Sequence, residues 1–363
     1  MKGELYSNWR RGAAALAARA LVVAACGDDD SSDSSSEGIQ ASGSSAMGAA
    51  MAAWVSEYNR IADASFEYAA IGSGGGRDQF LEGITVFAGS DVPLNDEEYA
   101  ASVDRCAGDQ GAVNLPHFVS AIAVFYNLPE IEGEQLNLPN DVLAKIFQGD
   151  ITNWSDEEIA AANPDLDLPD RSLEAIVRND DSGTTENFTE YLDAAAPGVW
   201  TGGVFGEWSE EGPSGVGSAQ FTEGVVAAVA AGEGSIGYAD LGQIGNLPAA
   251  AIGVADGFAP PTADGASAVF AASERLNGNN ELDFAYELNR TPDSADVYPL
   301  SFVAYHIVCV EYDDADTAAQ VRDFMTFVGS EDGQQIAEEL AGSTPLSNDL
   351  RNQLAATIDA IGP

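Results

Sequence analysis

Short apolar strands that end in turns rich in Gly, Ser or Thr, and then continue as helices, recur along this chain. The clearest such unit spans residues 176–185 and reads Ile-Val-Arg-Asn-Asp-Asp-Ser-Gly-Thr-Thr. Arg178 ends its strand as a permanent cation, and Ser182 begins its helix. The first N–H groups of a helix lack partners within the helix, and the helix dipole favours negative charge there. The unit is therefore suited to hold an anion, although an ordinary N-cap at Ser182 with Arg178 on the surface explains the same residues.

Repetition of this unit predicts the α/β class. Strands are expected near residues 39–41, 66–71, 86–91, 119–126, 172–177, 235–238 and 298–310. Helices are expected near residues 47–58, 77–82, 136–149, 182–189, 221–231, 321–328, 333–340 and 347–361. Alternation of this kind is typical of mostly parallel sheets with helices on their faces, which bind ligands beyond the carboxyl ends of their strands. Residues 253–289 show no clear pattern.

Polar turns follow four of the predicted strands, at residues 43–46, 72–75, 90–91 and 178–184. Their hydroxyl and backbone N–H groups suit a small anion, and their glycines let the backbone approach a ligand closely. None of them matches the P-loop pattern, which needs Gly-Lys-Ser/Thr. A single turn of this type is more often structural, but four in equivalent places indicate a binding site.

Asp91 is the acidic member of this set. A carboxylate repels a bound anion unless the anion carries a proton that it can donate, as hydrogen phosphate does and sulfate at neutral pH does not. A site whose buried acceptor needs such a donor can reject the analogue without it by roughly 10⁴–10⁵. Arg178 would offset the charge of the carboxylate and bind oxyanion oxygens with its forked guanidinium. The alternative role for Asp91 is an N-cap of the following turn.

The first residues are typical of an export signal. Residues 1–25 combine a basic start with a short apolar run, and Cys26 follows in a context that resembles a bacterial lipobox. Residues 26–38 are rich in Ser and Asp, so we expect a disordered tether after a lipidated Cys26. A plain signal with an incidental cysteine is the alternative, and Arg10-Arg11 hints weakly at twin-arginine export.

Composition excludes several functions. The formal net charge of −45 argues against a nucleic-acid partner and against an electrostatic membrane patch. Cys106 and Cys309 in an exported chain favour a disulfide over a metal site. His117 and His306 show no metal-ligand spacing, so neither a metal nor another cofactor is expected.

Seven motifs in order resemble the substrate-binding proteins of the ATP-driven phosphate uptake system, the Pst phosphate-binding proteins. They are ASGSS (41–45), IGSGGG (71–76), GSDVPL (89–94), IFQGDITNW (146–154), RNDDSGTT (178–185), GSIGY (234–238) and YPLS (298–301). The resemblance covers nearly the whole mature chain. It implies a two-lobed, type II periplasmic-binding-protein-like fold with the ligand in the cleft. Lobe I would comprise residues 39–113 and 298–363, lobe II residues 114–297, and the hinges would lie near 111–117 and 295–301.

The resemblance also implies roles for single residues. Ser45, Ser73 and Ser182 would offer hydroxyls, Ala46, Gly183 and Thr184 mainly backbone N–H groups, Arg178 the cation and Asp91 the acceptor. Members often have an aromatic residue and a proline where Ala46 and Met47 stand, and a glycine at Asp181. Asp180 matches an acidic position that restrains the arginine.

The function implied is a monomeric, non-catalytic receptor on the outer face of the cell membrane, held by its lipid anchor only. It would bind inorganic phosphate and deliver it to the membrane subunits of an ABC permease as the lobes close. Another tetrahedral oxyanion, such as sulfate or molybdate, is the first alternative. A phosphatase-like relative and a structural or adhesive surface protein are the others.

Overall fold

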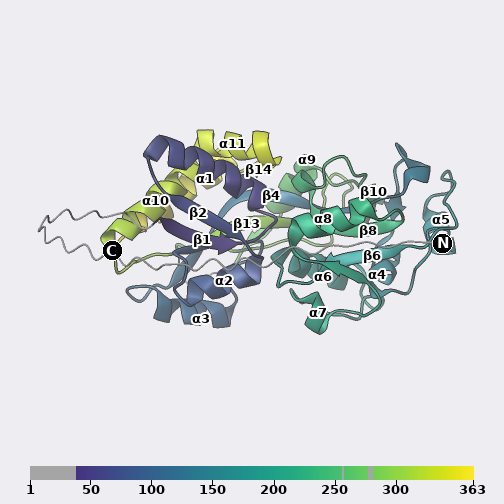
Figure 1. The fold of residues 1–363 in the computed structure, drawn as a ribbon, viewed down its shortest axis with the longest axis horizontal. Coiled ribbons are helices and arrows are strands. Elements are labelled where there is room, and N and C mark those ends of the chain that lie inside the picture. The colour runs from purple at the N-terminus through teal and green to yellow at the C-terminus, as the bar shows by residue number, and fades with distance from the viewer. Residues whose placement is uncertain (1–37, 256, 277–280) are drawn as a thin grey trace, which may run out of the picture. The chain divides into compact units, whose positions relative to one another are not determined.

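The computed structural model describes residues 38–255, 257–276 and 281–363 (Figure 1). The predicted signal, the lipidated Cys26 and the tether up to residue 37 lie outside the described residues. No helix in the described part is both long and apolar enough to cross a membrane.

Strands and helices alternate through most of the chain. The strands of the main sheet are β1 (Ile39–Gly43), β2 (Phe66–Ala70), β3 (Phe87–Ser90), β4 (Ala112–Tyr126), β6 (Glu174–Arg178), β7 (Gly217–Ala219), β8 (Ser235–Asp240), β13 (Ser301–Cys309) and β14 (Thr344–Pro345). The other strands are β5 (Asn137–Leu138), β9 (Ala251–Val254), β10 (Gly257–Ala259), β11 (Glu274–Arg275) and β12 (Tyr286–Glu287). The helices are α1 (Gly48–Ala62), α2 (Ser73–Leu81), α3 (Asp96–Arg105), α4 (Asn140–Gln148), α5 (Glu157–Ala162), α6 (Gly183–Ala195), α7 (Trp208–Glu211), α8 (Phe221–Ala231), α9 (Ala263–Ala271), α10 (Ala315–Gly329), α11 (Glu331–Ala341) and α12 (Asn348–Ala360), with 3₁₀ turns η1 (Pro129–Ile131) and η2 (Leu241–Gln243).

The main sheet has the strand order β2-β1-β3-β13-β4-β8-β6-β7. At one end β1 lies between β2 and β3 in parallel, and at the other end β6 lies between β7 and β8 in parallel. In between, β13 and β4 run antiparallel to their neighbours. The sheet thus consists of two parallel groups joined by two antiparallel strands, which agrees with the predicted mostly parallel α/β class.

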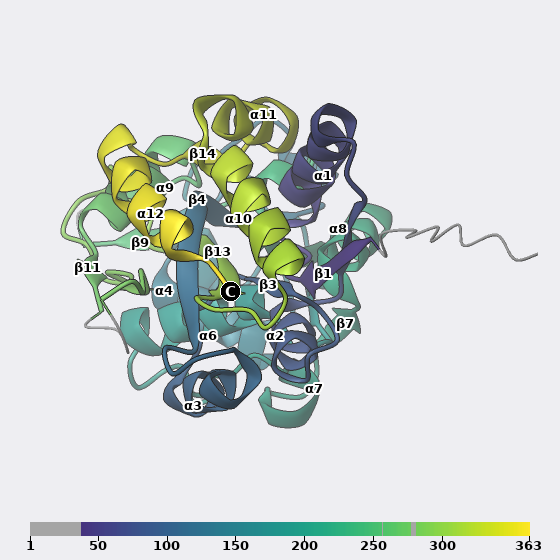
Figure 2. The same cartoon turned by 90° about the vertical axis from the view of Figure 1, so that its left-hand side faces the viewer.

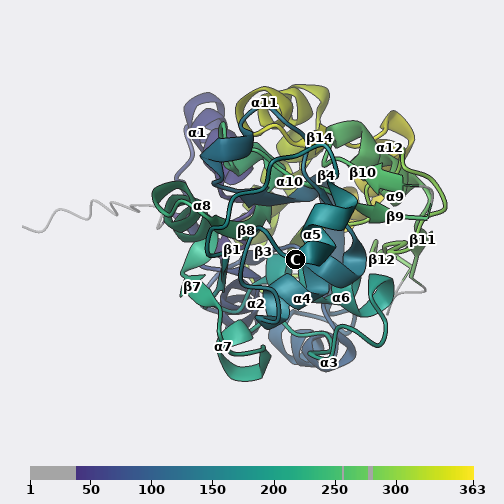
Figure 3. The same cartoon turned by 90° about the vertical axis from the view of Figure 1, so that its right-hand side faces the viewer.

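Helices cover both faces of the parallel groups. Around β1 and β2, the helices α1, α10 and α11 lie on one side and α2 and α3 on the other (Figures 1 and 2). Around β8 and β6, α8 lies on one side and α4 and α6 on the other (Figure 3). Strands covered on both faces bury their side chains in succession, as β3, β4, β8 and β13 do at every position, whereas β2 and β7 keep partly exposed positions.

Strand β4 is longer than predicted and joins the two parallel groups. It pairs with β13 from Ala112 to Ala121 and with β8 from Ile122 to Tyr126. The prediction began this strand only at Val119, whereas the strand also includes Pro116, which lacks an N–H. The proline is tolerated where the register of β13 shifts, between Ala304 and Tyr305. The division into two lobes stays a prediction, and the strand changes partners eight residues beyond the proposed boundary at 113/114.

Other boundaries differ more modestly. The helix expected at 136–149 is preceded by β5, so α4 begins only at Asn140. The unpatterned stretch 253–289 contains the end of β9, the whole of α9 and three very short strands. Strands of two or three residues are too short to show a periodicity of two, which explains why they escaped prediction.

The chain's two histidines meet in the core between β4 and β13. The two Nδ1 atoms of His117 and His306 lie 2.7 Å apart, and His306 Nε2 lies 3.0 Å from Met51 Sδ. Both rings are fully buried, so desolvation lowers the pKa of His117 to about 3 and places the pKa of His306 well below its usual value. The pair is therefore neutral and packs as part of the core.

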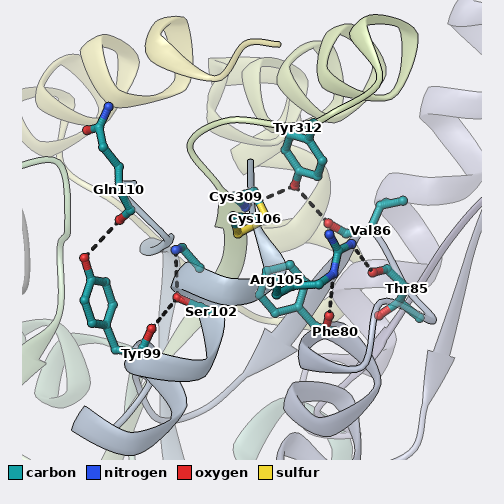
Figure 4. Close-up of a disulfide and its surroundings, with 11 residues drawn as sticks. Phe80, Thr85, Val86, Tyr99, Ser102, Arg105, Cys106, Gln110, Cys309 and Tyr312 are labelled. Atoms are coloured by element: carbon teal, nitrogen blue, oxygen red, sulfur yellow. Dashed lines mark hydrogen bonds between the residues drawn. A yellow bond between two sulfur atoms is a disulfide. The ribbon is translucent and has the colours of Figure 1, made fainter. Parts of the chain in front are cut away.

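Cys106 and Cys309 form a disulfide across 203 residues of sequence (Figure 4). It joins the residue after α3 to the last residue of β13. Tyr312 OH accepts from Cys309 N at 3.1 Å and donates to Val86 O at 2.8 Å. The bond therefore ties the α3–β4 connection to the end of the returning strand, at the opposite end of the β13–β4 pairing from Ser301.

Asp240 is a carboxylate buried at the end of β8. Its Oδ1 accepts from Ser120 Oγ on β4, and its Oδ2 lies 3.4 Å from Gln243 Nε2. Burial raises the pKa of Asp240 to about 7 and the nearby Asp91 adds to the effect, whereas the bonds from Ser120 and Gln243 oppose it. Folding therefore favours the protonated form of this side chain.

We expect the double variant Cys106→Ala/Cys309→Ala to lose about 2–5 kcal/mol of unfolding free energy, because the bond closes a long loop in the unfolded chain. Chemical denaturation of the variant and of the oxidised protein measures the loss. Thiol titration before and after reduction is the control. Finding both thiols free before reduction would contradict the bond.

Asp240 should make the stability depend on pH. Since its folded pKa is raised above the unfolded value, its contribution is complete below about pH 4 and is lost as the pH rises to about 7, at up to ~1.4 kcal/mol per pH unit. Unfolding of Asp240→Asn between pH 4 and 8 should therefore show a flatter curve than the original protein. The exposed Asp193→Asn serves as control, and parallel curves for all three proteins would refute the prediction.

Candidate functional site

The turn after β3 meets the first turn of α6. Asp91 Oδ2 accepts from Thr184 Oγ1 at 2.7 Å, and Asp91 N donates to Ser73 Oγ at 3.2 Å. A Cβ atom on Gly183 would lie 2.6 Å from Ser73 Oγ and 3.0 Å from Asp91 Cβ, so a glycine is required at this close approach. The structure thus brings together four residues of the predicted site that come from three separate turns.

Asp91 is 2% exposed, and its two carboxylate oxygens differ in their hydrogen-bond partners. Oδ2 has Thr184, whereas Oδ1 is buried and finds no hydrogen-bond donor among the described residues. Burial raises the pKa of Asp91, while the hydroxyls of Ser44 and Thr184 and the charges of Arg178 and Arg77 oppose that rise. A buried acceptor without a donor is costly, and a ligand that carries a proton would remove this cost.

Arg178 is held by Asp180 in a forked pair. Arg178 Nε donates to Asp180 Oδ1 at 2.8 Å and Nη2 donates to Asp180 Oδ2, which fixes the plane of the guanidinium. Arg178 is 2% exposed, and its Nη1 points to Thr222 Oγ1 at 3.4 Å. Because Asp180 balances the charge of Arg178, an anion here must be held largely by directed hydrogen bonds.

Ser45 lies beside this pair through Thr222. Its Oγ is 3.0 Å from Thr222 Oγ1 and accepts from Thr222 N at 3.0 Å. Ala46, predicted to offer its N–H to a ligand, donates instead to Ser44 Oγ at 3.1 Å. Its carbonyl and that of Ser45 accept from Gln243 Nε2 at 2.6 and 3.1 Å.

The start of α6 offers free backbone donors. Ser182 caps the helix, because its Oγ accepts from Thr185 N at 3.2 Å. The N–H groups of Gly183 and Thr184, like that of Ser45, have no acceptor among residues 38–255, 257–276 and 281–363. Since Ser182 Oγ serves as the cap, the contribution of this turn rests mainly on its N–H groups and the helix dipole.

Asp181, a departure from the pattern of the resembled family, packs against the turn after β2. Its main-chain oxygen accepts from Gly74 N at 3.3 Å, and a Cβ on Gly74 would lie 1.9 Å from Asp181 Oδ2. Burial raises the pKa of Asp181, and the positive charge of Arg77 opposes that rise. The additional carboxylate is therefore accommodated by a glycine on the facing turn.

Several site neighbours were missed by sequence reasoning. Thr222 stands at the start of the predicted helix 221–231, but β7 before it was not predicted, so the strand-turn-helix pattern did not select it. Asn187 lies four residues after Gly183 on the same helical face, and its Nδ2 donates to Asp91 O at 2.9 Å. Gln243 carried no signal, because it follows no strand-turn-helix pattern.

The arrangement suits a small tetrahedral anion that both accepts and donates hydrogen bonds. Donors come from helix starts, hydroxyls and Arg178, and the acceptor is Asp91. Within the described ranges no group of three or more His, Cys, Asp or Glu side chains is placed to hold a metal ion.

Comparison with known proteins agrees with this geometry. Residues 28–332 match the family model described as PBP superfamily domain. The phosphate-binding protein PstS 2 of Mycobacterium tuberculosis is 35% identical over 89% of this chain and 87% of its own length. PstS 3 of the same organism is 34% identical over 89% of this chain and 86% of its length.

A solved structure supports the fold. The phosphate-binding protein from Stenotrophomonas maltophilia superposes with a TM-score of 0.69 at 22% identity, over 88% of this chain and 93% of that chain. The predicted periplasmic-binding-protein-like α/β fold is therefore confirmed. On the strength of the family model and the PstS relatives, this chain belongs to the PBP superfamily and, within it, to the family of PstS phosphate-binding proteins.

Proposed function

We propose that this protein is an extracytoplasmic receptor that binds inorganic phosphate without transforming it. Its relatives are named phosphate-binding proteins, and none of the names reported above denotes an enzyme. One observation carries the proposal: among the described residues, Asp91 Oδ1 is buried without a donor, and the N–H groups of Gly183 and Thr184 have no acceptor. A protonated oxyanion satisfies both kinds of group at once.

In this proposal, different residues bind the anion and select which anion is bound. The N–H groups at the start of α6, the hydroxyls of Ser45 and Ser73, and Arg178 bind oxygens of any small oxyanion. Asp91 selects the anion that can donate a proton. Sulfate and molybdate lack that proton at neutral pH. A phosphatase would need a metal or a histidine base to activate a serine, but the proposed set contains no histidine and the described residues hold no group of three or more metal-binding side chains.

Delivery to an ABC permease is the second part of the proposal. Hydrogen bonds at the site link residues of the predicted lobe I to residues of the predicted lobe II, among them Thr184–Asp91, Asn187–Asp91, Thr222–Ser45 and Gln243–Ala46. Lobes that close in this way would bury the anion and present one joint surface to the permease. Lipidation at Cys26 would hold the receptor on the outer face of the membrane.

We expect phosphate and arsenate, but not sulfate or molybdate, to stabilise protein that has been freed of bound phosphate. A ligand at 100 times its Kd adds about 2.7 kcal/mol, which thermal unfolding resolves. Equal shifts with sulfate and phosphate would end the selection argument. No shift with phosphate would end the receptor proposal.

The variant Asp91→Asn should gain sulfate binding and lose most of its preference for phosphate, because the amide supplies a donor in place of an acceptor. Calorimetric titration with both anions measures the preference. Asp283→Asn, another buried carboxyl, is the control and should keep it. An unchanged preference in Asp91→Asn would assign selection to other residues.

The variant Arg178→Lys should bind phosphate about 10- to 100-fold more weakly, because a lysine keeps the charge but cannot make the forked contacts. The partly exposed Arg171, which pairs with Glu130 and Glu233, provides the matched control Arg171→Lys. Affinities within twofold of each other for all three proteins would show that charge alone matters at residue 178.

A further inference from the structure

Thr222, which the predicted site did not include, lies between Ser45 and Arg178. It is 1% exposed and stands in the first turn of α8. Its N–H donates to Ser45 Oγ at 3.0 Å, its Oγ1 lies 3.0 Å from the same Ser45 Oγ, and Arg178 Nη1 donates to that Oγ1 at 3.4 Å. Thr222 thus contacts Ser45 twice and the buried cation once.

The number of hydrogens limits how these groups bond. Each hydroxyl has one hydrogen to donate and two lone pairs to accept with. One hydrogen lies between the two oxygens, and the Thr222 N–H already occupies a lone pair of Ser45. One hydroxyl hydrogen therefore remains for a further acceptor. Neither hydroxyl has another acceptor among the described residues.

We propose that Thr222 is a positioning residue that turns the hydroxyl hydrogen of Ser45 towards the bound anion. Thr222 donates both its N–H and its O–H to Ser45 Oγ and receives Arg178 Nη1 on its own oxygen. Both lone pairs of Ser45 are then occupied, so its hydrogen has only the anion to bind. This inference rests on the proposed phosphate function and adds a residue to it.

The backbone conformation just before Thr222 indicates that the surrounding residues fix the position of Thr222. Phe221 has a φ of 62°, in the left-handed region that a bulky non-glycine residue rarely adopts. Its N–H donates to Asp180 Oδ1 at 2.8 Å, and the same oxygen accepts from Arg178 Nε. Asp180 therefore fixes both Arg178 and the start of α8, and strain of this kind persists where the surroundings determine the conformation.

The test uses the nearly isosteric variant Thr222→Val, which keeps the backbone N–H and removes the hydroxyl. We expect phosphate to bind about 3- to 10-fold more weakly, the effect of one hydrogen bond. Thr222→Ser should restore the affinity to within twofold. Thr357→Val is the matched control, because Thr357 is 2% exposed on α12 and its hydroxyl, within the described part of the chain, bonds only Leu282 O, at 3.2 Å.

A double-mutant cycle separates positioning from packing and from direct contact. If Thr222 acts through Ser45, then Thr222→Val should weaken binding no further in a Ser45→Ala background. Additive losses would overturn the inference in favour of a direct contact with the anion. An unchanged affinity in Thr222→Val, or a loss that Thr222→Ser does not restore, would overturn it in favour of a packing role.

The same titrations keep this inference apart from the proposed function. If the unmutated protein binds phosphate and the Thr222→Val variant binds it with equal affinity, only the role of Thr222 is contradicted. If the unmutated protein binds no phosphate after its bound phosphate has been removed, the receptor proposal and the inference are both contradicted. Thermal unfolding of the ligand-free variants checks that each of them is folded.

Discussion

The pairing of β4 with two different strands is the constraint on which the site depends. Nine of its first ten residues pair with β13 and its last five with β8, so one strand connects both parallel groups. The turns that follow β1, β3 and β6 thereby meet, although they lie far apart in sequence. Ligand sites beyond the carboxyl ends of parallel strands follow from this arrangement.

The positive charge in the site is balanced by an ion pair, and the anion would be bound by directed hydrogen-bond donors. The chain carries a formal charge of −45, and Asp180 already balances the site cation Arg178. Exposed carboxylates are screened by salt over about 8 Å, whereas buried N–H groups and helix dipoles act at contact distance. An acidic protein can therefore hold an anion, provided that local donors rather than net charge determine the binding.

Prediction from the sequence succeeded where the signal is short-range. The start of α6 was predicted because Ser182 and Gly183 at a helix start have a local role. The range of α8 was also predicted, and β8 was recognised as a short buried strand. It failed where the structure depends on distant residues. The first half of β4 was missed, because it pairs with the distant strand β13 and contains a bulge at His117, between the partners of Ala304 and Tyr305.

The sequence by itself determined the α/β class, the strand-turn-helix units and the chemistry of their turns, because these follow from neighbours within a few residues. Arg178 and Ser182 could be identified as an anion-holding pair in this way. Only the tertiary structure decided that Asp180 clamps Arg178, that Thr184 meets Asp91, and that Thr222 stands against Ser45. Contacts between residues 177 positions apart depend on sheet register and helix packing, which no local pattern encodes.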